Sequence, residues 1–302
     1  MAVLLSGCTA APAAAPAQSK IVIAVQPTAT AATLSADAKQ LSDHLAKRLG
    51  RPVEIVFPTT YAGVIESLRF GHASAGFMSA WPALLAQKHA GASIDLAEIR
   101  EVVIGQDRVE KPFYYSHYVV RKDSPAAKLA DLRGKRVAFP NNLSTSGYVA
   151  PLAKLIELGL IQAGPGKVAD PTPFFGAGNV LFSGGYQQGW EALKAGQVDV
   201  TVIAGDVSES LYREVLANAK VIETQGPIPS HSVAFSKELD AATKAQLATA
   251  LLELGSPELR PLMRTFISGI FVGFQKTTGA EHLGALDAFL SSTQLTFVET
   301  LR

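Results

Sequence analysis

Three hydroxyl side chains stand in a row where a strand pattern gives way to a helical one. Ser144, Thr145 and Ser146 lie between the apolar stretch "RVAFP" and a helical pattern that begins at Gly147. A helix start presents unpaired N–H groups and a partial positive charge, so it attracts anions. Hydroxyl donors would add to that attraction, and glycine lets a ligand approach the backbone. These residue types indicate a cradle for an oxyanion.

The same stretch carries no lysine and does not match G-x-x-x-x-G-K-[ST], the pattern of a phosphate-transfer loop. Neutral donors hold an oxyanion without transferring it, which suits a protein that binds and releases. The plain alternative is helix capping, because Ser, Thr and Asn collect at helix N-caps without any ligand. The stretch alone leaves both interpretations open.

Other chemistries find little support in the sequence. The chain has no G-x-S-x-G nucleophile elbow, and "GAGNVL" at 176–181 lacks the third glycine of a dinucleotide-binding turn. The six histidines are spread from His44 to His282 with no close pair at helical spacing. Paired carboxylates such as "ELD" fit solvated helix starts better than a glycosidase cleft. We therefore expect no enzyme, no catalytic residue, no metal site and no cofactor.

The amino-acid composition limits the classes of binding partner that this chain is expected to have. Of 302 residues, 48% are hydrophobic and 18% charged, which is enough to bury a sizeable core. Lys and Arg number 27 against 26 Asp and Glu, so no basic excess indicates nucleic acid or an anionic membrane surface. No apolar run reaches the ~18 residues that span a bilayer. A single cysteine excludes a disulfide within the chain.

That cysteine, Cys8, lies in an informative N-terminus. "LSGC" resembles a bacterial lipobox, in which cleavage precedes a lipidated cysteine, and the Ala/Pro segment after it cannot form a core. No basic residue precedes the apolar run, which is a departure from that motif, so an incidental cysteine is the alternative. The lipobox interpretation predicts lipidation of Cys8 and an exported protein anchored at the outer face of a bacterial membrane, periplasmic or extracytoplasmic.

The elements that must position the hydroxyls alternate regularly between strand and helix, which argues for an α/β fold with mainly parallel sheets. The patterns predict strands at 20–28, 52–60, 73–79, 114–125 and 198–206, and helices at 35–50, 61–71, 81–91 and 206–219. A further strand pattern lies within "IREVVIGQD". Residues 171–185 read as irregular and strand-like, 219–239 as one connecting strand, and three helical stretches finish the chain.

Extended connections near 114–122 and 224–236 suggest two lobes around a hinge. The cluster "YYSHY" falls in the first of them, and its alternate residues are expected to face the cleft, with Tyr115 or His117 as candidate contacts. We assign 1–19 to a signal remnant and disordered tether, 20–116 plus 233–302 to lobe 1, and 117–232 to lobe 2.

Several segments share their order and spacing with one known family. They are "TTYAGVIESLRFG", "YYSHYVVRKDSP…LADLRGKRVAF", "STSGY", "SGGYQQGWEALKAGQVDV" and "GPIPSHSVAFSKEL". The chain thereby resembles the phosphate/phosphite/phosphonate-binding solute receptors of ABC importers over nearly all of 20–300. The resemblance implies a type II periplasmic binding protein, in which two α/β lobes, each a sheet flanked by helices and joined by two hinge strands, close on the ligand.

The resemblance also implies roles for particular residues. The hydroxyl run grips phosphonate oxygens in the family, so Ser144, Thr145 and Ser146 inherit that role. The tyrosine of "YAG" faces the cleft, which gives Tyr61, and the acid after the "VDV" strand gives Asp206. The loop at "GFMSAWP" implies Ser79 and, through a looser match, Trp81.

Two positions depart from the family pattern. Where some relatives carry a second acid after "IP", this chain has His231, and where a histidine often follows "GG", it has Tyr186. We expect both to be ligand contacts, with His231 as a cation or neutral donor and Tyr186 as a hydroxyl donor. Taken without the family, each of these side chains also has a structural explanation, as a cap, a hinge residue or a packing residue.

Together these features predict the extracytoplasmic binding protein of an ABC importer, a monomer that takes a small phosphorus oxyanion and delivers it to a membrane permease. A single carboxylate at Asp206 suits a protonated oxygen of phosphate, phosphite or a phosphonate monoanion better than fully ionised sulfate. The alternatives are a ligand-sensing receptor for a signalling partner, a binder of another oxyanion, or an enzyme on the same scaffold.

Overall fold

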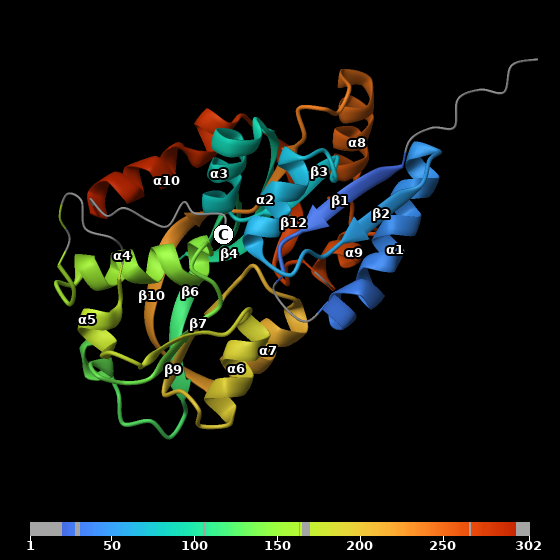
Figure 1. The fold of residues 1–302 in the computed structure, drawn as a ribbon. Coiled ribbons are helices and arrows are strands. Elements are labelled where there is room, and N and C mark those ends of the chain that lie inside the picture. Colours follow the sequence, from blue (N-terminus) through green and yellow to red (C-terminus); the bar gives the residue numbers. More distant parts are fainter. Residues whose placement is uncertain are drawn as a thin grey trace, which may run out of the picture.

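A computed structural model of the protein describes residues 20–27, 31–104, 107–162, 164, 170–265 and 267–293. Cys8 and the segment at 1–19 lie outside these residues. The described part of the chain forms two β-sheets with helices packed on them, and the sheets stand side by side as two lobes (Figure 1).

Lobe 1 is built on a seven-stranded sheet in the order β12–β4–β11–β3–β1–β2, with β5 paired to β4. Its strands are β1 (Ile21–Val25), β2 (Val53–Val56), β3 (Ala75–Met78), β4 (Ser93–Ile104), β5 (Asp107–Lys111), β11 (Ser232–Phe235) and β12 (Phe271–Lys276). Its helices are α1 (Ala31–Leu49), α2 (Tyr61–Arg69), α3 (Ala80–Ala90), α8 (Ala241–Glu253) and α9 (Arg260–Arg264).

Lobe 2 is built on a five-stranded sheet in the order β10–β6–β9–β7–β8. Its strands are β6 (Phe113–Arg121), β7 (Val137–Phe139), β8 (Val180–Phe182), β9 (Val200–Ala204) and β10 (Ala219–Pro229). Its helical elements are η1 (Leu129–Leu132), η2 (Thr145–Val149), α4 (Ala150–Glu157), α5 (Thr172–Phe175), α6 (Tyr186–Lys194) and α7 (Glu209–Asn218). The last helix, α10 (Gly279–Thr293), packs on α3 of lobe 1 and on β10 and α4 of lobe 2.

The strand pairing corrects one detail of the predicted fold. Parallel pairing is confined to β1 with β2 and β3, and to β7 with β8 and β9. The other pairs are antiparallel, so each sheet is mixed rather than mainly parallel. The reason for several of these pairs is connectivity: β4 leads into β5, β5 into β6 and β10 into β11 without an intervening helix that would return the chain to a parallel start.

The chain passes from lobe 1 to lobe 2 between β5 and β6, at Pro112, and returns between β10 and β11, at Ser230 and His231. The predicted connecting strand at 219–239 is therefore two strands in two different sheets. The structure also adds β5 and β12, which the patterns did not predict, and places α5 and β8 within the irregular stretch 171–185. The lobe boundaries after 116 and before 233 stay a prediction.

Two apolar clusters hold these layers together. One lies between the lobe 1 sheet and helices α1, α8 and α9, and includes Ile23, Leu45 and Leu251. The other includes residues of α2 and α3 and continues into the core of lobe 2 through Tyr114 and Val149. Because this second cluster is shared, apolar burial holds the lobes in contact in this arrangement. Among the described helices none is both long and apolar enough to cross a bilayer.

Candidate functional site

The predicted site residues lie where strands end, at the edges that the two lobes turn toward each other. Ser79 directly follows β3, and Gln26, which was not among the predicted residues, directly follows β1. In lobe 2, Asp206 comes two residues after β9, and the 144–146 run follows β7 through a short loop. The carboxyl ends of parallel strands form the ligand crevice of open α/β sheets, so this placement is expected of a binding site.

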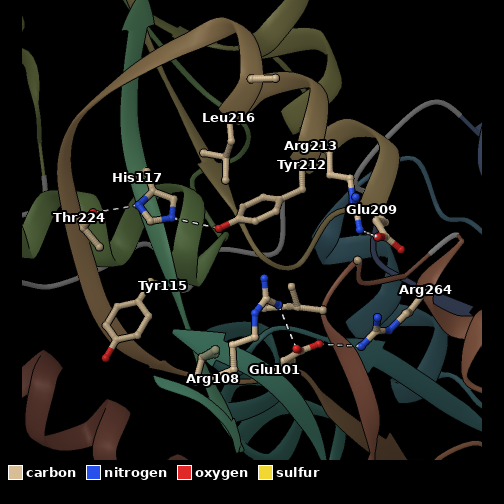
Figure 2. Close-up of a pocket in the computed structure, with 14 residues that line it drawn as sticks. Glu101, Arg108, Tyr115, His117, Glu209, Tyr212, Arg213, Leu216, Thr224 and Arg264 are labelled. Carbon is tan, nitrogen blue, oxygen red and sulfur yellow. Dashed lines mark hydrogen bonds and ion pairs between the residues drawn. The ribbon is translucent and has the colours of Figure 1, made fainter. Parts of the chain in front are cut away.

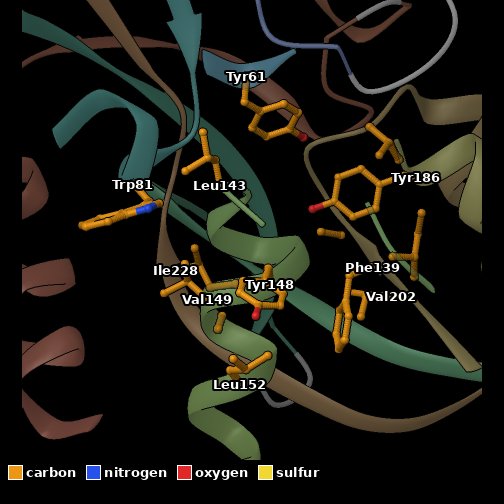
Figure 3. Close-up of a cluster of buried hydrophobic side chains, with 14 of the residues drawn as sticks. Tyr61, Trp81, Phe139, Leu143, Tyr148, Val149, Leu152, Tyr186, Val202 and Ile228 are labelled. Carbon is orange, nitrogen blue, oxygen red and sulfur yellow. The ribbon is translucent and has the colours of Figure 1, made fainter. Parts of the chain in front are cut away.

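All the predicted ligand contacts are buried, and none of these residues is more than 4% exposed. They are Tyr61, Ser79, Ser144, Thr145, Ser146, Tyr186, Asp206 and His231. Figure 3 shows Tyr61 from α2 and Tyr186 from α6 with both hydroxyls directed at the same region between the lobes. Side chains that lie far apart in the sequence therefore form one polar cluster inside an apolar interface.

Ser146 and Asp206 form the centre of this cluster. Ser146 Oγ donates to Asp206 Oδ2 at 2.9 Å, and lies 2.6 Å from the Tyr186 hydroxyl. The Tyr114 hydroxyl lies 2.8 Å from Ser146 Oγ and 3.3 Å from Asp206 Oδ2. Several hydroxyl donors thus converge on one carboxylate oxygen, which is the arrangement that an oxyanion would need.

The other two hydroxyls of the run have structural partners as well. Ser144 is the N-cap of η2, and its Oγ accepts from Gly147 N–H at 2.9 Å, so capping and ligand binding coexist at this residue. Thr145 Oγ1 accepts from the backbone N–H of Trp81 at 2.7 Å, which joins lobe 2 to the start of α3 in lobe 1. A hydroxyl that accepts one bond keeps its own proton to donate, so Thr145 remains a donor.

Lobe 1 reaches the cluster through a short series of polar contacts between side chains and one backbone amide. His231 Nε2 lies 3.3 Å from Asp206 Oδ2 and 3.2 Å from Gln26 Nε2. Gln26 Oε1 in turn accepts from Ser79 N–H at 2.8 Å. The connection between β10 and β11 therefore delivers His231 to the carboxylate of the opposite lobe.

Several buried polar atoms of this cluster have no well-aligned hydrogen bond to other described residues. They are Tyr61 OH, Ser79 Oγ, Asp206 Oδ1 and His231 Nδ1, the last of which lies 4.0 Å from Glu98 Oε2. A buried polar group without a partner costs roughly 1–3 kcal/mol, so such groups are rare and are expected to gather where a ligand binds.

Burial and neighbouring charges shift the pKa values of the Asp206 carboxyl and of the tyrosine hydroxyls in this cluster. Burial by itself raises the pKa of Asp206, but the hydrogen bond and charge of His231, the charge of Arg100 and the bond from Ser146 outweigh it and leave that pKa lowered. Burial, aided by the Asp206 charge, raises the pKa values of Tyr61, Tyr114 and Tyr186. At neutral pH the carboxylate is therefore ionised and the tyrosines are donors.

Comparison with known proteins decides the family. Residues 23–282 match the family described as ABC transporter, phosphonate, periplasmic substrate-binding protein. The chain belongs to this family. The match covers the strands, helices and hydroxyl run that form the cluster.

Relatives in this family differ in their named ligands. The chain is 29% identical over 180 residues to the phosphate-import protein PhnD of Mycolicibacterium smegmatis, across 59% of this chain and 53% of the relative. It is 26% identical over 227 residues to the phosphonates-binding periplasmic protein of Escherichia coli, across 72% of this chain and 62% of that protein. The chain thus spans less than two thirds of the length of either relative.

Among solved structures, the binding protein component of an ABC phosphonate transporter from Pseudomonas aeruginosa matches with a TM-score of 0.72 at 21% identity. The match covers 91% of this chain and 86% of that one. At this identity the likeness concerns the fold, which is the two-lobe type II periplasmic binding protein. The α/β class and the two-lobe architecture predicted from the sequence are confirmed.

The polar cluster of this phosphonate-binding family member also contains residues that the sequence analysis did not predict. In the hinge cluster, Tyr114 faces the polar cluster, whereas Tyr115 and His117 lie on the opposite side of β6. The prediction for Tyr115 and His117 was therefore wrong, because alternation in a strand defines two faces without saying which one meets the cleft. Gln26 was missed as well, although its position at the end of a parallel strand was a usable signal.

A buried ion pair supports Tyr114 from behind. Glu98 and Arg100 share one face of β4, both are no more than 1% exposed, and Arg100 Nε donates to Glu98 Oε2 at 3.1 Å. The Arg100 guanidinium lies 4.1 Å from the centre of the Tyr114 ring. A cation stacked on this ring fixes its direction, and so holds its hydroxyl at Ser146 and Asp206.

The geometry of Ser146, His231 and Asp206 differs from that of a catalytic triad. A Ser-His-Asp triad needs histidine between the serine and the acid, so that the ring can take the serine proton. Here Ser146 and His231 both contact the same oxygen of Asp206, and no bond joins them in the described geometry. The described residues also contain no group of three His, Cys, Asp or Glu side chains placed to hold a metal ion. The family and its structural neighbours are substrate-binding transport proteins.

Proposed function

We propose that this chain is the extracytoplasmic binding component of an ABC importer and that its ligand is a small phosphorus oxyanion, namely a phosphonate, phosphite or phosphate. One observation carries the proposal: hydroxyl donors and a single ionised carboxylate from both lobes converge in a buried cluster that retains unpartnered polar atoms. The names of the M. smegmatis and E. coli relatives, which import phosphate and bind phosphonates, support the ligand class.

Binding follows from the donors of the cluster. The oxygens of the ligand accept from Ser144, Thr145 and Ser146, from the amide groups of the helix start, and from the tyrosine hydroxyls. Tyr61 and Ser79 belong to lobe 1 and the hydroxyl run belongs to lobe 2, so the ligand holds the lobes together. Exclusion of water then strengthens each contact between a dipole and the anion.

Selectivity follows from Asp206. A buried carboxylate repels an anion unless that anion brings a proton to share. The monoanions of phosphate, phosphite and phosphonates carry a P–O–H group, and the dianions can gain one near neutral pH. This O–H donates to the Asp206 carboxylate. Sulfate has no such proton, so Asp206 acts against it.

Transport requires two further features. We place the partner, an ABC permease, at the surface that both lobes form when they are in contact, and we expect lobe motion about the crossings at Pro112 and at Ser230 and His231.

For localisation we propose a monomer held at the outer face of a bacterial membrane by a lipid on Cys8. Replacement of Cys8 by serine should then release the full chain from the membrane fraction, and retention there would contradict the anchor.

Titration calorimetry of the full chain tests the ligand class. The panel is phosphate, phosphite, hypophosphite, methylphosphonate, aminoethylphosphonate, arsenate and sulfate. We expect saturable one-to-one binding of at least one phosphorus oxyanion, with sulfate at least about a hundredfold weaker, because the cost of an unpaired buried charge exceeds about 3 kcal/mol. Binding of sulfate alone, or turnover of any ligand, would contradict the proposal.

A further inference from the structure

A large cavity lies on the far side of the hinge strand from the oxyanion cluster. Its volume is about 850 Å³, within the range of small-molecule sites. One wall comes from lobe 1, through Glu101, Arg108 and Arg264, and the other from helix α7 of lobe 2, through Tyr212 and Leu216 (Figure 2). The cavity therefore exists only while the two lobes keep their present distance.

The lining of this cavity has a definite chemistry. Three arginines, Arg108, Arg213 and Arg264, face two glutamates, Glu101 and Glu209, which leaves one positive charge in excess. Each glutamate is already paired: Arg108 and Arg264 contact Glu101 at 2.9 and 3.2 Å, and Arg213 pairs with Glu209. The surplus is therefore a guanidinium charge, and the ligand that balances it carries one negative charge.

The rest of the lining is aromatic and apolar. Tyr115 and His117 project from β6 into the cavity, and Tyr212 and Leu216 approach from α7 (Figure 2). The His117 ring is fixed by Thr224 Oγ1 at 2.9 Å and by the Tyr212 hydroxyl at 3.2 Å. Burial lowers the pKa of His117 to about 4, so this ring is neutral at pH 7. Flat rings beside a guanidinium accept a planar aromatic group by stacking.

Adjacent residues of the same strands contact the oxyanion cluster on one side and the cavity on the other. Tyr114 contacts Ser146 in the cluster while its neighbour Tyr115 lines the cavity. Arg100 stacks on Tyr114 while its neighbour Glu101 lines the cavity. Strand β6 is therefore a shared wall, and both sites report on the same arrangement of the lobes.

A close contact between the lobes borders the cavity. Gly269 N–H donates to Val207 O at 2.7 Å, and Ser268 Oγ donates to Gly205 O at 2.9 Å, one residue before Asp206. A Cβ on Gly269 would lie 2.4 Å from Glu209 Cα, so the backbones meet without room for a side chain. Any separation of the lobes at this edge moves α7 away from β4 and changes the cavity.

We propose that this cavity is a second binding site, for a small aromatic monoanion, and that its occupancy favours the lobe arrangement in which the oxyanion cluster is assembled. A ligand that fits between the two walls stabilises that arrangement, and by linkage it raises the affinity for the oxyanion. The second part of the proposal rests on the proposed function; the first part does not.

The probe for the cavity is 1-anilinonaphthalene-8-sulfonate, an aromatic monoanion whose fluorescence rises in apolar surroundings. We expect saturable binding to the full chain at pH 7. Leu216→Glu places a carboxylate in the cavity at a side chain that is already 38% exposed, so it should weaken the binding at least about tenfold. The matched control is Leu181→Glu, a leucine 45% exposed on β8 and away from the cavity, which should bind the probe as the parent does. Near-UV circular dichroism verifies that both variants are folded.

Equal probe binding by the parent and by Leu216→Glu would overturn the site, whether or not any oxyanion binds. The coupling is tested separately, by calorimetric titration of the phosphorus oxyanion that binds, with and without saturating probe. We expect the affinity to rise about fivefold or more, in line with typical coupling between sites. An unchanged affinity would overturn the coupling, and failure of every oxyanion to bind would instead contradict the proposed function.

Discussion

Ser146 Oγ and Asp206 Oδ2 lie 2.9 Å apart although 60 residues separate them in the chain. The first residue stands in the opening turn of η2 and the second follows β9, so the bond joins a helix start to a strand end. The carboxylate thereby accepts from the donors that the oxyanion is expected to use. Asp206 orients these donors in advance, and an incoming anion must share them with a fixed negative charge.

The hydroxyl run should carry much of the binding energy. Ser144→Ala combined with Ser146→Ala is expected to lower the affinity for the oxyanion at least about tenfold, since hydrogen bonds to a charged group contribute roughly 1.5–3 kcal/mol each. Titration calorimetry measures the loss. Ser144→Ala also removes the cap on Gly147 N–H, so it should cost about 1 kcal/mol of unfolding free energy in a denaturant titration.

A control for the serine variants comes from another helix. Ser208 is the N-cap residue of α7 but makes no side-chain cap bond, and it lies outside the polar cluster. Ser208→Ala should leave the affinity unchanged. If the double serine variant bound as tightly as Ser208→Ala, the helix start would not be the ligand site.

Asp206 should set the choice between phosphorus oxyanions and sulfate. Asp206→Asn removes the charge and supplies an N–H donor, so we expect sulfate to gain affinity relative to phosphate by roughly tenfold or more, the equivalent of about 1.4 kcal/mol. Competition calorimetry with both anions gives the ratio. Asp199→Asn is the matched control, because Asp199 pairs with Arg136 outside the cluster. Equal selectivity in the parent and in Asp206→Asn would reject this role.

Much of this site could be predicted from the sequence, for a local reason. Strand–helix alternation places the residues that follow strands, such as Ser79, Ser144 and Asp206, at one edge of each sheet. Their positions depend on short segments whose patterns are strong. The family resemblance singled out Ser79 and Asp206 among the residues that follow strands and added Tyr61, Tyr186 and His231, and the structure brings these side chains into the same cluster.

What the sequence could not show depends on pairing between distant segments. The face of β6 that meets the cluster is set by its register with β9, in which Ser116 pairs with Ala204, and no local pattern encodes that register. No local pattern singled out Glu98 and Arg100, because charged residues are seldom fully buried, yet both are buried in β4 and Arg100 lies against the Tyr114 ring of lobe 2. Strand β12 was missed because "FVGFQK" gains its partner, β4, from far along the chain.

Thr145 should act on ligand release through the contact between the lobes. Its Oγ1 accepts from the backbone N–H of Trp81 across the interface, and Thr145→Val removes that acceptor while keeping the branched shape. The lost bond between the lobes, about 1 kcal/mol, corresponds to roughly a fivefold weaker affinity, and loss of the hydroxyl that donates to the ligand lowers the affinity further. We expect the change in the dissociation rate, because the bond exists only while the lobes touch. Stopped-flow fluorescence measures both rates.

A second buried threonine separates this effect from general loss of stability. Thr201 Oγ1 donates to Ala138 O at 2.9 Å, and both residues belong to the sheet of lobe 2. Thr201→Val should lower the unfolding free energy but leave ligand release unchanged. The same acceleration of release in both variants would show that Thr145 does not act through the lobe contact.

His117 should make the protein less stable as the pH falls from neutral. Burial lowers the pKa of this ring to about 4 in the folded chain, against about 6.5 when unfolded. As the pH falls below about 6.5, the unfolded chain binds a proton that the folded chain does not take up until about pH 4. The unfolding free energy must therefore fall across this window. Urea unfolding at several pH values measures the slope.

Replacement of this ring gives the test. His117→Gln cannot bind the proton in either state, and the amide can still reach Thr224 and Tyr212, so the variant should lose less unfolding free energy than the parent between pH 6.5 and about 4. His72→Gln, at an exposed histidine before β3, is the matched control and should leave the slope close to that of the parent. If His117→Gln lost stability as steeply as the parent over this window, the buried ring would not be the source of the acid sensitivity.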